Sequence, residues 1–197
     1  MNFLYPVFLK MHRFETLIVG GGNVALEKLS FLLKSSPDAE VTLVSPGILS
    51  EIEELVEKYR NVKFIQREFQ PVDLEGKQLV IVSTEKHNLN KRIQQLATNK
   101  GILTNVADTP ALCDFYLGSI VTKGDLKIAI STNGKSPTFS KRFRQVLEEM
   151  LPEELPELLE NLHLYRNKLN NDFRFKVKAL NELTSSLLDK PKKETAT

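Results

Sequence analysis

Three consecutive glycines follow the first strongly apolar segment of the chain and offer phosphate-binding chemistry. Residues 16–19 form a short aliphatic run that predicts a buried strand, and Gly20, Gly22 and Ala25 then fit the pattern G-x-G-x-x-A at the start of an amphipathic helix. The first glycine permits a tight turn, the second lets the backbone approach a pyrophosphate, and the small third residue allows close packing of helix on strand. Helix-terminal amides would hold the phosphates. The predicted cofactor contacts here are Gly20, Gly21, Gly22, Asn23, Val24 and Ala25.

The second predicted strand, residues 40–45, ends where the ribose of a dinucleotide would lie. It ends in Ser45, Pro46 and Gly47, whereas the usual fingerprint has an Asp or Glu that binds the ribose hydroxyls. Ser45 or backbone amides must then take that role. No arginine follows to receive a 2′-phosphate, so NAD is favoured slightly over NADP. By itself, the glycine match fits a purely structural turn equally well, and the strand, turn and helix around it favour a nucleotide site.

Asp108 is the residue best placed for proton chemistry. It follows a predicted strand, residues 102–106, at the carboxyl end, where open α/β sheets bind their ligands. A carboxylate there could accept or steer a proton. The alternative is that Asp108 only caps the turn at Thr109 and Pro110, which is a common task for aspartate.

Alternating strands and helices must position these groups. Strands are also predicted at residues 62–66 and 79–83, and helices at residues 50–59 and 88–99, which implies a parallel sheet. Ser50 and Glu53 form a capping-box signature that predicts Ser50 as the cap of the first of these helices. Residues 115–121 and 126–130 predict an antiparallel hairpin or meander, followed by helices to about Leu188, with Pro152 and Pro156 as breaks. We therefore predict an α/β fold: a Rossmann-type NAD-binding domain (1–112), a small antiparallel region (113–150) and a helical C-terminal region (151–197) whose last residues are frayed.

Composition restricts the function further. A hydrophobic fraction of 41% and a charged fraction of 26% are ordinary for a globular protein, and no apolar run reaches membrane-spanning length. A net charge of +2 gives no reason to expect a nucleic-acid partner. The single cysteine, Cys113, allows no disulfide framework or cysteine-rich zinc site and is read as a buried hydrophobe. No secretory signal is recognised, so we expect a cytoplasmic protein without a membrane partner or a metal.

Four ordered segments carry a more specific pattern than the glycine motif alone. They are residues 19–25 with Lys28, Ser83-Thr84 with Asn88 and Asn90, residues 105–108, and residues 130–137. In order and spacing they resemble the precorrin-2 dehydrogenase family, including the dehydrogenase module of siroheme synthase. The resemblance spans roughly three quarters of the chain.

This resemblance implies an NAD-dependent homodimer that oxidises precorrin-2 to sirohydrochlorin, with residues 113–150 as its dimerisation region. In that family an aspartate at the position of Asp108 is the residue most closely tied to catalysis. The substrate carries many carboxylates, and the loop before the helix that begins at Ser136-Pro137 offers hydroxyls, amides and a lysine for them. Ser136 is the expected N-cap of that helix, with Pro137 at its first position. Thr84 joins the predicted cofactor contacts, and the predicted substrate contacts are Asn105, Ser131, Thr132, Lys135 and Ser136.

Two alternatives stay open on the sequence. The chain could be bifunctional and also insert ferrous iron into sirohydrochlorin, as some relatives do, with Asp108 serving both reactions. It could instead be an NAD-sensing module without catalytic activity, since glycine-turn domains also serve as sensors.

Overall fold

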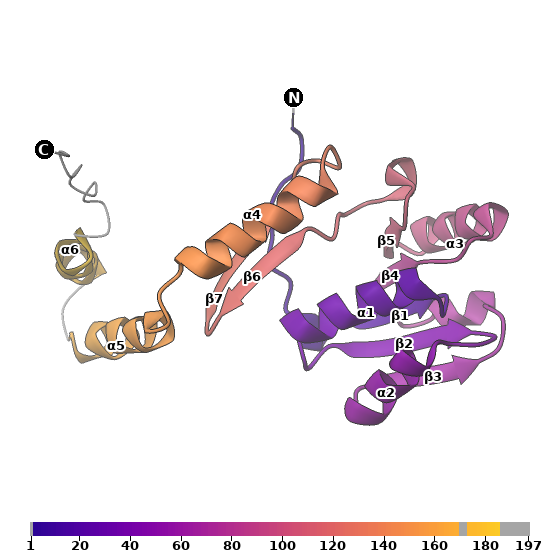
Figure 1. Cartoon of the computed structure of the whole chain (residues 1–197), viewed down its shortest axis with the longest axis horizontal. Helices are drawn as coiled ribbons and strands as arrows, with labels where there is room; N and C mark the ends of the chain where they lie inside the picture. Colours follow the sequence, from indigo (N-terminus) through magenta and orange to yellow (C-terminus); the bar gives the residue numbers. More distant parts are fainter. Residues whose placement is uncertain (1, 170–172, 186–197) are drawn as a thin grey trace, which may run out of the picture. The chain divides into compact units, whose positions relative to one another are not determined.

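The computed structural model describes residues 2–169 and 173–185 (Figure 1). The chain divides into two compact units, which are described separately. Unit 1 comprises residues 1–120 and 129–142, and unit 2 comprises residues 121–128 and 143–197. Among the described residues, no helix has the length and apolar character that crossing a membrane requires.

Unit 1 is built on a five-stranded parallel sheet with the order β3-β2-β1-β4-β5. Its strands are β1 (Glu15–Val19), β2 (Glu40–Ser45), β3 (Val62–Gln66), β4 (Leu79–Val82) and β5 (Leu103–Val106). The aliphatic, largely β-branched sequences of β1, β2 and β4 suit strands that are covered on both faces, whereas the edge strand β3 is buried only at Val62. All five lie within one residue of the predicted ranges, and the parallel α/β fold is confirmed.

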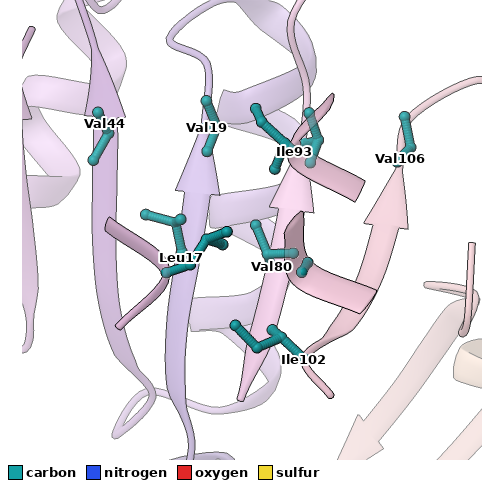
Figure 2. Packing of buried hydrophobic residues seen from close by; sticks show 10 residues of the cluster. Leu17, Val19, Val44, Val80, Ile93, Ile102 and Val106 are labelled. Atoms are coloured by element: carbon teal, nitrogen blue, oxygen red, sulfur yellow. The ribbon is translucent and has the colours of Figure 1, made fainter. Parts of the chain in front are cut away.

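Helices cover both faces of this sheet (Figure 1). They are α1 (Asn23–Ser35), α2 (Ser50–Lys58) and α3 (His87–Asn99). Because successive side chains of a strand point to opposite faces, β1 contributes to two cores. Leu17 and Val19 pack in one cluster with Ile93 of α3, whereas Ile18 packs in the other with residues of α1 and α2. Figure 2 shows the first cluster, with Val44, Val80, Ile102 and Val106 around the same centre.

Short elements complete the connections of this unit. Three 3₁₀ turns lie at η1 (Met11–Arg13), η2 (Pro71–Leu74) and η3 (Pro110–Leu112). At η2, Asp73 accepts hydrogen bonds from the Gln70 amide at 2.8 Å and from the Arg67 guanidinium. These bonds fix the crossover from β3 to β4.

The remaining elements are a hairpin and three helices. They are β6 (Ser119–Lys123), β7 (Leu126–Ile130), α4 (Pro137–Met150), α5 (Leu155–Lys168) and α6 (Phe173–Leu183). The antiparallel hairpin is confirmed, although its first strand begins at Ser119 and the segment 115–118 is not a strand. Phe115 instead packs against the core of the sheet, which explains why an apolar run there is not part of the hairpin.

Two local predictions about helix ends are wrong. Ser50 does not cap α2 but is its first helical residue. The N-cap is Leu49, whose backbone is extended and whose amide donates a hydrogen bond to the Gly21 carbonyl at 3.1 Å. Pro156 does not break a helix but lies in the first turn of α5. Backbone amides in the first turn have no intrahelical acceptor, so a proline there costs no helix hydrogen bond. The predicted helix end near Leu188 and the tail from Asp189 lie outside the described residues.

Candidate nucleotide and substrate site

The carboxyl edge of the parallel sheet brings together four of the segments singled out in the sequence. Val19 is in register with Val44 on one side and Val82 on the other, and Val82 is in register with Val106. The glycine turn and the segments that begin at Ser45, Ser83 and Ala107 therefore leave the sheet at the same edge. The chain moves from β1 outward to β3 and then returns to β4, so the strand order reverses between β1 and β4. Open α/β sheets bind ligands at such a reversal.

The first two glycines of the turn are required by close contacts within the protein. Gly20 has a φ of +125°, and a Cβ at this position would lie 2.7 Å from the Ser83 carbonyl oxygen. A Cβ on Gly21 would overlap the Gly47 carbonyl oxygen and lie 2.7 Å from Ser45 Oγ. These two residues let three connecting segments of the sheet edge pack against one another.

Gly22, unlike Gly20 and Gly21, is not required by a close contact, because a Cβ there would have no atom within 4 Å. It precedes α1, and it has no side chain to satisfy the helix amides. The first amides of a helix have no intrahelical partner, and those of α1 belong to the predicted contacts Asn23, Val24 and Ala25. Open space beside unsatisfied amides at a positive helix end fits a pyrophosphate. Ala25 is fully buried, which meets the requirement for a small residue under the helix.

At the end of β2, Ser45 is buried and its hydroxyl donates to the Gly47 carbonyl at 2.7 Å. This bond closes the turn through Pro46, whose ring is exposed together with Gly47. The hydroxyl hydrogen of Ser45 is thus engaged within the protein, and its oxygen lone pairs and the local backbone are the groups left for a ribose.

The segment after β4 contains Ser83 and Thr84. Ser83 donates to the Val19 carbonyl through both its amide at 2.8 Å and its hydroxyl at 3.0 Å, which ties β4 to the glycine turn. The Thr84 hydroxyl donates to the Asn90 side chain and accepts from the Lys86 amide at 3.2 Å. Asn90 in turn donates to the Thr84 carbonyl at 2.8 Å. Thr84 therefore organises the start of α3 at this edge of the sheet.

Asp108 stands two residues beyond β5 in a left-handed backbone conformation with a φ of +57°. Aspartate is one of the few non-glycine residues that tolerate this region. The turn is closed by the backbone, where the Thr109 amide donates to the Val106 carbonyl at 3.2 Å. The Asp108 side chain is exposed, and among the described residues it makes no hydrogen bond. Side-chain capping of the Thr109-Pro110 turn is therefore not observed.

After η3, residues 113–115 run back beside β5. The Asp114 amide donates to the Thr104 carbonyl at 2.8 Å, and its carboxylate accepts from the Thr104 amide at 2.9 Å. Cys113 Sγ accepts from the Val106 amide at 3.3 Å. Burial raises the pKa of the Cys113 thiol, and the neighbouring Asp114 charge raises it further. This half-buried thiol packs against the core, as predicted, and is poorly suited to act as a nucleophile.

Asn105, a predicted substrate contact, points into the same region and is 6% exposed. Its side-chain amide donates to the Phe115 carbonyl at 2.8 Å and lies 3.7 Å from Cys113 Sγ.

The loop before α4 holds the other predicted substrate contacts. Asn133 and Gly134 have φ values of +55° and +75°, and the Lys135 amide donates to the Thr132 carbonyl at 3.1 Å, which closes a tight turn. Ser136 caps α4 as predicted, since its hydroxyl oxygen accepts from the Phe139 amide at 3.2 Å.

The hydroxyl oxygens of this loop accept hydrogen bonds from its own backbone. Thr132 Oγ1 accepts from the Ser136 amide at 3.1 Å, and Ser131 Oγ accepts from the Asn133 amide at 3.2 Å. Each hydroxyl that serves as an acceptor keeps its own hydrogen for donation. Together with the exposed ammonium of Lys135, these donors suit an anionic group.

Comparison with known proteins agrees with this geometry. Residues 7–119 match a family described as putative NAD(P)-binding, and residues 123–150 match the family described as sirohaem biosynthesis protein central. The chain belongs to the putative NAD(P)-binding family. The resemblance stated from the four segments is thereby confirmed.

The similar proteins are siroheme synthases and a precorrin-2 dehydrogenase. A siroheme synthase of Vesicomyosocius okutanii is 35% identical over 173 residues, which cover 88% of this chain and 36% of that protein. A siroheme synthase of Nitrosococcus oceani is 34% identical over 164 residues, covering 83% and 34%. The chain thus spans about a third of the length of these relatives. A solved structure titled SirC, precorrin-2 dehydrogenase, has a TM-score of 0.75 and 26% identity over 91% of this chain and 89% of that one.

The sequence did not indicate the supporting roles of three residues at the site. Ser83 holds the glycine turn, and Cys113 and Asp114 tie the segment after Asp108 to β5. The last two could not be found by pattern, because their partners lie on β5 and the segment 108–115 has no strand or helix period.

Proposed function

We propose that this chain is an NAD-dependent dehydrogenase that oxidises precorrin-2 to sirohydrochlorin. The observation that carries the proposal is the position of Asp108 relative to the glycine turn. β5, which precedes Asp108, lies two strands from β1, on the side opposite β2. Neighbouring strands are about 4.8 Å apart, so Asp108 and the glycine turn are separated by about 10 Å along the sheet edge. A dinucleotide whose ribose lies beside β2 and whose pyrophosphate lies at the glycine turn would direct its reactive ring toward Asp108. The name of the similar SirC structure supports the choice of substrate.

In this mechanism, each group of residues has one task. NAD bound at the glycine turn would supply the hydride acceptor. Loss of two hydrogens from precorrin-2 releases one hydride and one proton, and Asp108 accepts or directs the proton because its carboxylate is exposed and uncommitted. Lys135 and the hydroxyls of Ser131, Thr132 and Ser136 bind substrate carboxylates. Ser45 and Gly47 contact the ribose through oxygen atoms and backbone groups.

We also propose that the protein is a homodimer. A homodimer built largely by residues 115–130 follows from the family resemblance, and Val146 and Met150 of α4 are 46% and 71% exposed, which leaves apolar surface for a second copy. A fully active monomer in sedimentation experiments at micromolar concentration would contradict this. A cytoplasmic location, the three-part domain division and the preference for NAD over NADP stay predictions.

Substitutions at Asp108 test the chemistry. Asn and Gly both accept the left-handed backbone, whereas Ala at a φ of +57° is strained by about 1 kcal/mol, so Asp108→Asn and Asp108→Gly remove the carboxylate without disturbing the turn. We expect both to bind NAD normally and to form NADH about a hundredfold more slowly in single turnover with saturating precorrin-2.

The outcomes separate the proposed enzyme from its alternatives. Near wild-type turnover in folded Asp108→Asn would contradict a proton-handling role. A wild-type chain that binds NAD but produces no NADH with precorrin-2 would instead favour an NAD-sensing module.

A further inference from the structure

The free edge of β5 is closed by side chains as well as by backbone. A strand at the end of a sheet presents unpaired amides and carbonyls, which usually pair with another strand or with water. Here the Thr104 amide is bound by the Asp114 carboxylate at 2.9 Å and the Val106 amide by Cys113 Sγ at 3.3 Å. The thiol lies 3.2 Å from the Val106 carbonyl and 3.4 Å from the Thr109 carbonyl. Both ends of the turn that carries Asp108 are therefore held at one sulfur atom.

Asn105 joins this arrangement from the strand side. Its amide nitrogen reaches Phe115 O at 2.8 Å and Cys113 Sγ at 3.7 Å, so one side chain spans the return segment. Phe115 itself packs against the core. An amide that is 6% exposed and bonded in this way has little access to a ligand.

The position of the Asp108 carboxylate depends on this enclosure. No side-chain hydrogen bond orients Asp108 within the described part of the chain, and its backbone is in a sparsely populated region. Residues in such regions persist when the surrounding structure over-determines them. The backbone position from which the carboxylate projects is thus set by the segment from residue 105 to residue 115, whose two ends Asn105 connects.

We propose that Asn105 is a positioning residue for the proposed dehydrogenation, which acts through Asp108 and does not bind substrate. This rests on the proposed function, because it assigns Asn105 to the reaction at Asp108. A misplacement of about 1 Å at a reacting group can cost about a hundredfold in rate. Asn105→Ala should therefore lower kcat by ten- to a hundredfold and leave KM for precorrin-2 and the affinity for NAD close to wild type.

A double-mutant cycle with Asp108→Asn distinguishes positioning from binding. If Asn105 acts through the carboxylate, Asn105→Ala should add little to the loss of kcat once that carboxylate is absent. If Asn105 binds substrate, the two losses should multiply and KM should rise, which would overturn the proposal.

Asn61 provides a matched control. It also bridges backbone segments with its side-chain amide, which donates to Pro37 O at 2.9 Å and to Ala39 O, but it precedes β3 at the opposite edge of the sheet. Asn61→Ala should lower the thermal stability and leave kcat unchanged. An equal fall of kcat in both variants would mean a general structural role and would overturn the proposal.

Hydrogen exchange supplies a readout that does not depend on activity. Asn105→Ala should accelerate exchange of the amides of residues 113–115 and leave those of β1 and β4 protected. If wild type produces no NADH while this local change occurs, the proposed function fails and the structural link stands. Unchanged exchange in this segment, with unchanged kcat, would refute the positioning role itself.

Discussion

Replacing Gly22 with aspartate separates nucleotide binding from folding. The residue has an extended backbone, with φ of −91° and ψ of −166°, which any residue can adopt, and a Cβ there would meet no atom within 4 Å. Gly22 is the N-cap of α1, a position at which aspartate is slightly better than glycine. We therefore expect Gly22→Asp to keep the free energy of unfolding or raise it by a few tenths of a kcal/mol.

The same substitution should remove most of the affinity for NAD. An aspartate cap would occupy the helix amides that the pyrophosphate needs, and its charge would repel the phosphates. A hydrogen bond to a charged group contributes about 1.5–3 kcal/mol, so the loss of one such bond together with the repulsion amounts to about 3 kcal/mol or more. This corresponds to at least about a hundredfold increase in Kd.

Gly22→Ser is the matched control, because serine caps a helix equally well without a charge. We expect its Kd to rise by about tenfold or somewhat more, from the lost hydrogen bond alone, and the difference between Ser and Asp to shrink as salt screens the repulsion. Gly21→Ala should behave in the opposite way and lower stability, since its Cβ would overlap the Gly47 carbonyl oxygen. Calorimetric titration with NAD and denaturant unfolding of each variant measure both effects. Wild-type affinity in folded Gly22→Asp would show that the nucleotide binds elsewhere.

Two further predictions concern stability. Thr16 is fully buried, and its hydroxyl is the buried side-chain polar atom without a hydrogen-bond partner among the described residues, so Thr16→Val should raise the free energy of unfolding by about 1 kcal/mol. The control Thr104→Val, which loses a hydroxyl bonded to Ile102 O at 3.3 Å, should bring no gain in urea unfolding, and equal gains would refute the explanation. Burial alone would raise the pKa of Asp73, but hydrogen bonds from Arg67 and the Gln70 amide hold this pKa below its ordinary value. The stabilisation is therefore present above the ordinary carboxyl pKa and is lost as pH falls through the lowered one. Asp73→Asn should destabilise the protein at pH 7, and progressively less as pH falls below the ordinary carboxyl pKa. A pH-independent difference would contradict this.

The sequence determined the sheet and most of the glycine turn. The inner strands β1, β2 and β4 were predictable because short aliphatic runs covered on both faces carry their signal locally. The glycine turn was predictable because its spacing follows from the close approach of backbone segments. The cap at Ser136 was predictable for the same reason, since a serine before a proline makes a helix start by local geometry. The cap at Leu49 was not, because it depends on a bond to Gly21, far away in the sequence.

The tertiary structure alone decided what the individual polar residues do. Gly21 and Gly22 are adjacent and chemically identical, yet one contacts the Ser45–Gly47 turn and the other faces open space. Asn105 and Asp108 belong to one short segment, yet the side-chain amide of Asn105 is buried against Phe115 and the side chain of Asp108 is exposed at a left-handed turn. Such differences arise from contacts between strands and their return segments. A sequence pattern records the periodicity of an element, but it does not record which neighbour each side chain meets when the elements pack.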